Sequence, residues 1–142
     1  MDDTYNLRRF VDAQDRVIDQ VLEELAAGEK RGHWMWFVFP QIQGLGQSAM
    51  AQEFSIKSKA EAQSYAAHEI LGPRLKECTR LVIAVEGRSI KQIFDYPDYL
   101  KFRSSMTLFM ACTADNALFK SAIDKYFDGK PDQSTLDILA SL

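Results

Sequence analysis

The segment Arg31-Gly-His-Trp-Met-Trp-Phe-Val-Phe-Pro40, continued by Gln-Ile-Gln-Gly-Leu-Gly46, is the most unusual part of this sequence. It holds both tryptophans of the chain, and four of its side chains are large aromatics: Trp34, Trp36, Phe37 and Phe39. The run fits neither the helical nor the strand period, because either element would have apolar side chains on both faces. Pro40 ends either element, and Gly44 and Gly46 allow a tight loop. The segment therefore predicts a buried centre for a small domain.

The sequence on either side of this segment is punctuated by helix starts and stops. Gly28 stands where a helix-ending glycine is expected. Ser58 with Glu61, and Ser89 with Gln92, have the spacing of capping boxes. We find no alternating strand pairs, no internal repeat and no linker. We therefore expect an all-α (mainly helical) fold, a single compact domain over residues 1–142 with about seven to eight short helices.

Composition narrows the class of protein. The chain has 142 residues, 46% of them hydrophobic, and a net charge of −3. This charge gives no general attraction to nucleic acid or to an anionic membrane surface, so we expect neither partner. The N-terminus lacks the pattern of a signal peptide and no apolar run reaches the length of a membrane span, so we expect a cytoplasmic protein. Cys78 and Cys112 lie far apart in apolar sequence and are interpreted as free, buried thiols.

The aromatic segment permits two interpretations. In the first, its rings are simply core. In the second, Trp34 and Trp36 form one wall of a site whose polar groups are His33, Gln41 and Ser48, with Gly44 and Gly46 in the loop between them. Aromatic faces stack on planar rings, while loop amides and a helix start attract anions. The second interpretation predicts a small anionic, nucleotide-like ligand. We favour burial as the segment's first role, because aromatic clusters pack more often than they line pockets.

A second polar cluster follows Pro97 in a predicted helix. Lys101, Ser104 and Ser105 share one face of that helix, and Arg103 lies on another. These four residues are candidates for binding a phosphate or carboxylate, as the wall opposite the tryptophans. The alternatives are a solvated helix flank or a hydrogen-bonded packing role.

His33 and His68 are the only histidines. His33 precedes the tryptophans directly and is the candidate for a general acid or base. His68 lies near the end of a predicted helix, where a cation is favoured. No metal-binding spacing, phosphate-binding P-loop or dinucleotide fingerprint occurs, so we expect no metal and no cofactor.

The longest motifs carry a family resemblance. The runs Gly32–Gln41 and Gly44–Ser48, followed by Leu71–Leu75, Val85–Ser89 and Lys101–Phe109, resemble the bacterial family called domain of unknown function 1810. The likeness covers nearly the whole chain in order. It implies a mainly helical, stand-alone cytosolic protein and no established activity. Some members carry the label calpastatin, which we discount because that inhibitor is a long disordered polypeptide.

Three hypotheses for function follow. The first is a small-molecule site, catalytic or not, for an anionic nucleotide-like ligand. The second is an interaction module, such as a homodimer, that docks through exposed parts of the aromatic segment. The third is that every aromatic side chain is core. Whether the protein is an enzyme stays open at this point.

Overall fold

Ten helices account for the regular structure of residues 3–142, the part of the chain that this computed structural model describes. They are α1 (Arg8–Asp15), α2 (Ile18–Ala27), α3 (Met35–Val38), α4 (Ala49–Glu53), α5 (Lys59–Ala67), α6 (Leu71–Ala84), α7 (Ile90–Phe94), α8 (Asp98–Cys112), α9 (Ala117–Phe127) and α10 (Gln133–Ser141). The described residues contain no strand, which confirms the all-α class. The expected number of seven to eight helices is too low.

Two features explain the higher number. Val17, with φ −135° and ψ 0°, leaves the helical region and separates α1 from α2, so that the N-terminal apolar stretch is two helices. The aromatic segment adds α3, a single turn that its apolar pattern does not identify as a helix. A helix this short has no repeat long enough to show a period.

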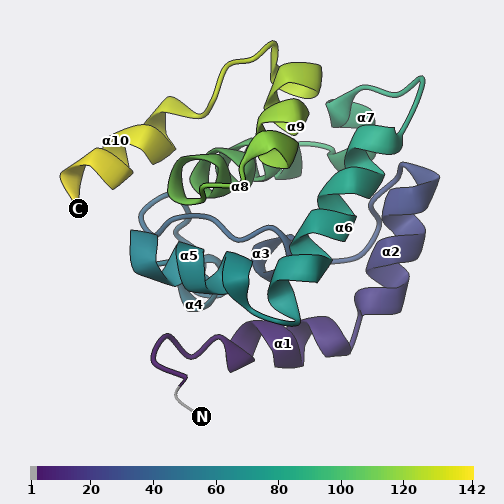
Figure 1. Cartoon of the computed structure of the whole chain (residues 1–142). Coiled ribbons are helices and arrows are strands. Elements are labelled where there is room, and N and C mark those ends of the chain that lie inside the picture. Colours follow the sequence, from purple (N-terminus) through teal and green to yellow (C-terminus); the bar gives the residue numbers. More distant parts are fainter. Residues whose placement is uncertain (1–2) are drawn as a thin grey trace.

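Helix α8 is the centre of the molecule (Figure 1). It packs against α9, α5, α10, α7 and α3. Buried residues occupy nearly every position from Phe102 to Phe109, the polar Ser104, Ser105 and Thr107 among them. Between Phe102 and Phe109 the helix has almost no solvent face, and so it lacks the one-sided apolar stripe of a surface helix.

The aromatic segment is neither a regular helix nor a strand for its whole length. After the single turn of α3 the chain becomes extended, and Ile42 forms a parallel β-bridge with Ile56. Phe39 has none of its surface exposed, and its ring meets that of Phe102 edge to face at 5.0 Å. The segment is therefore core, as its composition predicts.

The helix ends mostly follow the predicted caps. Gly28 adopts φ 74° and ends α2, and Ser89 and Gln92 form a complete capping box at α7. Ser58 Oγ accepts the hydrogen bond of Glu61 N, which is half of the predicted box at α5. The Glu61 carboxylate does not return the bond and has other partners.

Candidate functional site

The two tryptophans have different environments. Trp34 is 1% exposed, so protein covers both faces of its ring, and its Nε1 donates to Glu24 Oε1 at 3.0 Å. Trp36 is only partly buried at the edge of the core. Of the two predicted stacking surfaces, Trp36 is the one that solvent reaches.

A buried carboxylate holds the start of the aromatic segment in place. Glu24 Oε1 accepts the backbone N–H groups of Arg31 at 2.7 Å and Gly32 at 2.9 Å, in addition to the Trp34 indole. Gln20 donates to Glu24 Oε2 at 2.6 Å. Burial by itself raises the pKa of Glu24, but these hydrogen bonds outweigh burial and lower the pKa to about 2. Glu24 is therefore charged at neutral pH and fixes the loop that carries His33.

Three charged side chains meet beside the tryptophans. Asp98, at the start of α8, lies between two lysines: Lys30 Nζ is 2.8 Å from its Oδ2, and Lys101 Nζ is 3.5 Å from its Oδ1. Lys30 is largely buried, and it also donates to the Gly32 carbonyl and lies over Trp34. Lys101 is more exposed, and its ammonium lies 5.1 Å from the centre of the Trp36 ring. The structure thus brings Lys101 to Trp36, as the two-wall hypothesis requires.

The remaining residues of the predicted first wall lie at the surface. His33 is exposed and makes no hydrogen bond with any residue that the structure describes. Gln41 is half-buried, and its backbone carbonyl accepts from Ile56 N at 2.9 Å. Gly44 is exposed with φ 109°, and Ser48 caps the short helix α4 through Ala51 N. A Cβ on Gly46 would lie 2.5 Å from Ala51 Cβ, so this loop packs closely on α4.

The other members of the predicted second wall bond to other parts of the fold or are enclosed in it. Arg103 Nε donates to the Lys130 carbonyl at 2.9 Å, and its Nη2 donates to the Pro131 carbonyl at 3.2 Å. Ser104 Oγ lies between the Leu100 carbonyl and Asp132 Oδ2. Both residues therefore dock the loop before α10, which is the packing alternative. Ser105 is fully buried, and its Oγ has no hydrogen-bond partner.

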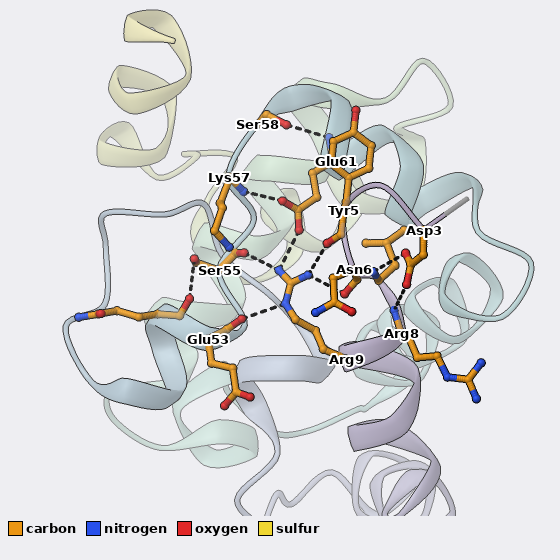
Figure 2. Close-up of polar contacts among 12 residues, drawn as sticks. Asp3, Tyr5, Asn6, Arg8, Arg9, Glu53, Ser55, Lys57, Ser58 and Glu61 are labelled. Atoms are coloured by element: carbon orange, nitrogen blue, oxygen red, sulfur yellow. Dashed lines mark hydrogen bonds and ion pairs between the residues drawn. The ribbon is translucent and has the colours of Figure 1, made fainter. Parts of the chain in front are cut away.

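The densest polar cluster was missed by sequence reasoning. Figure 2 shows the guanidinium of Arg9 donating through all five of its N–H positions to the carbonyls of Tyr5, Asn6, Glu53 and Ser55 and to Glu61 Oε2. The Arg9–Glu61 ion pair measures 2.8 Å, with 3% of the Glu61 side chain exposed. Because every donor has an acceptor, this cluster has no group left for a ligand and is structural. The one sequence signal here was Glu61 itself, interpreted as a cap.

Neither thiol is suited to nucleophilic chemistry. Cys78 and Cys112 are free and buried, as predicted. Burial raises the pKa of Cys78 to about 12 and also raises the pKa of Cys112. Within residues 3–142 no group of three or more His, Cys, Asp or Glu side chains is placed to hold a metal ion, and no helix is long and apolar enough to cross a membrane.

Comparisons with known proteins agree with the resemblance seen in the sequence. The profile of the family described as protein of unknown function DUF1810 matches residues 4–139. A search of curated proteins found no match. Among solved structures, the chain is similar to the conserved hypothetical protein Rv1873 from Mycobacterium tuberculosis, with 54% identity, a TM-score of 0.96, and coverage of 97% of this chain and 99% of that one.

Proposed function

Because the chain belongs to the DUF1810 family, whose description names no activity, we propose a function from its own side chains: it binds a small anionic ligand with a planar ring. The proposed site is the Trp36–Lys101 surface, which consists of Lys30, His33, Trp36, Asp98 and Lys101. The observation that carries the proposal is the position of the Lys101 ammonium over the part-exposed ring of Trp36. A ring stacked on Trp36 would place its charged group within reach of Lys101.

The balance of charge supports an anion. Two lysines share the single carboxylate of Asp98, so the cluster keeps an excess positive charge. Lys30 holds Asp98 at 2.8 Å and is almost enclosed, whereas the contact of Lys101 is longer and 24% of its side chain is exposed. Lys101 can therefore turn to a ligand while Lys30 keeps Asp98 neutralised.

The proposal is limited to binding. A general acid or base is normally oriented by a hydrogen bond from a second group. His33 has no such partner among the described residues. His33 is an exposed polar group next to Trp34 in the sequence, and we assign it no chemical step.

Tryptophan fluorescence tests the proposal directly, because the chain has two tryptophans and one of them is buried. We expect adenosine monophosphate to quench the emission of Trp36 saturably. Adenosine, which lacks the charge, and inorganic phosphate, which lacks the ring, are expected to bind more weakly by about tenfold or more. Lys101→Gln should weaken binding of the monophosphate about tenfold, since it removes a charged contact.

Two variants serve as references for this titration. Trp36→Leu should abolish the quenching, whereas Lys120→Gln, an exposed lysine of α9 paired with Asp124, should leave it unchanged. Equal quenching of the wild type and the Trp36→Leu variant would contradict the proposal, as would an affinity that Lys101→Gln leaves unaltered.

A further inference from the structure

Two adjoining cavities lie on another part of the surface. One, of about 490 Å³, lies over α5 and α6, and the other, of about 360 Å³, continues to the end of α8 and the start of α9. Both are lined by Ala66, Ala67 and Lys76, so together they form one hollow, the α5–α6 groove. None of the residues of the Trp36–Lys101 surface lines it. Cavities of this size are typical of small-molecule sites.

Three of the residues that line the larger cavity are small: Ala66, Ala67 and Gly72. The chain turns from α5 into α6 so closely that a Cβ on Gly72 would lie 2.3 Å from the Ala66 carbonyl oxygen. Position 72 therefore admits only glycine, and the short side chains of Ala66 and Ala67 add little bulk to the groove.

Lys76 is the charge that both cavities share. Its side chain is half-buried, and its ammonium makes no ion pair or hydrogen bond with any residue that the structure describes. An anion in the groove would give this ammonium the partner that the described part of the protein does not supply. Arg80, one helical turn further along α6, also lines the larger cavity and also lacks a partner among the described residues.

His68 supplies a third donor to the same cavity. Its Nδ1 accepts the backbone N–H groups of Ile70 at 3.1 Å and Leu71 at 3.2 Å, at the start of α6. An imidazole nitrogen that accepts hydrogen bonds carries no proton, so the proton of the neutral ring lies on Nε2. Nε2–H has no partner among the described residues. His68 stands directly after the last residue of α5, near the helix end where the sequence predicts it, and its imidazole also caps the start of α6 as an acceptor.

From these three donors we infer that the α5–α6 groove is a second binding site, for a compound bearing a doubly charged oxyanion, a phosphate or a dicarboxylate. Lys76 is the principal contact, and His68 Nε2–H and Arg80 complete it. Glu69 and Glu77 also line the larger cavity, and Asp115 lines the smaller one, but all three are exposed, so their carboxylates can stay in solvent. Their charges nevertheless weaken the attraction, and we expect dissociation constants of about 1 mM.

The two histidines provide the readout. In a protein labelled with ¹³C in the histidine rings, inorganic phosphate and succinate are titrated separately at constant pH and ionic strength. We expect the ring signals of His68 to shift saturably with one or both anions, while those of His33, which lines neither cavity, report separately any binding at the Trp36–Lys101 surface. A response to phosphate alone, or to succinate alone, identifies which of the two sources the site accepts.

Variants of Lys76 decide the assignment. Lys76→Gln should weaken binding about tenfold, Lys76→Arg should retain it, and Lys120→Gln should have no effect. Unchanged circular dichroism of each variant shows that it is folded. The inference is overturned if neither anion shifts His68 saturably up to about 50 mM, or if Lys76→Gln responds like the wild type. Because this readout is independent of Trp36 emission, its failure leaves the proposed function standing.

Discussion

Replacing Arg9 with methionine is expected to lower the free energy of unfolding by about 3–5 kcal/mol, the usual cost of removing one partner of a buried ion pair. Methionine keeps the apolar stem but leaves the carboxylate of Glu61 and four backbone carbonyls without the guanidinium that donates to them (Figure 2). For a domain of this size the melting temperature should fall by roughly 10 °C. Chemical denaturation followed by circular dichroism measures the loss.

The neighbouring residue offers a matched control. Arg8 lies on the same helix, and its pair with Asp12 measures 3.5 Å with both side chains exposed. Such pairs contribute little, so Arg8→Met should change stability by less than about 0.5 kcal/mol. Arg9→Lys should not rescue the fold, because an ammonium has three donors where the site presents five acceptors. Equal effects of the Arg8 and Arg9 substitutions would show that the cluster is not structural.

This cluster also shows where prediction from sequence ends. Arg9 and Glu61 lie 52 positions apart, and neither belongs to a sequence motif that predicts a contact with the other. The serine caps at α5 and α7 were predictable, because a cap and the amide it bonds are three residues apart. Contacts between distant segments depend on how helices pack, which local spacing does not encode.

The aromatic segment illustrates a different limit. Its composition correctly predicted burial, since large aromatic side chains bury much area. Its geometry was not predictable, because one helical turn followed by a single bridge has no period to detect. Of the Asp98–Lys101 pair beside Trp36, the sequence analysis predicted Lys101 as a site residue but did not identify Asp98.

The polar residues of α8 had two explanations that sequence could not separate. The guanidinium of Arg103 and the hydroxyl of Ser104 are groups that can bind a phosphate. The same groups can equally donate hydrogen bonds to backbone carbonyls and to the carboxylate of a helix cap. In the fold they hold Lys130, Pro131 and Asp132 before α10. The residue type is the same in both roles, and only the position of α10 distinguishes them.

Glu24→Ala is expected to be the second severe substitution, with a loss of about 2–4 kcal/mol. It removes the acceptor of two backbone N–H groups and of the buried Trp34 indole, and an unsatisfied buried donor costs about 1–3 kcal/mol. Glu23→Ala is the control, because that neighbour is exposed on the same helix. Urea denaturation at neutral pH measures both, and a loss no larger than that of the control would contradict the role assigned to Glu24.

The pH dependence of the same carboxylate gives a sharper test. The pKa of Glu24 is about 2 in the folded protein, against an ordinary value of 4.5. Between these two values the unfolded chain binds more protons than the folded one, so the contribution of Glu24 to stability is complete above pH 4.5 and is lost as the pH falls towards 2. At neutral pH that contribution is roughly 3–4 kcal/mol, since each pKa unit between 4.5 and about 2 corresponds to about 1.4 kcal/mol.

Glu24→Gln isolates that contribution, because it removes the titrating group and keeps an oxygen that can accept from Arg31, Gly32 and Trp34. The difference in unfolding free energy between wild type and variant should therefore shrink as the pH is lowered from 5 to 2. Other carboxylates, such as Glu61 in its pair with Arg9, are present in both proteins, so acid weakens both and their effect cancels in the difference. A difference that stays constant over this range would show that the loop from Arg31 to Trp34 does not depend on a charged carboxylate.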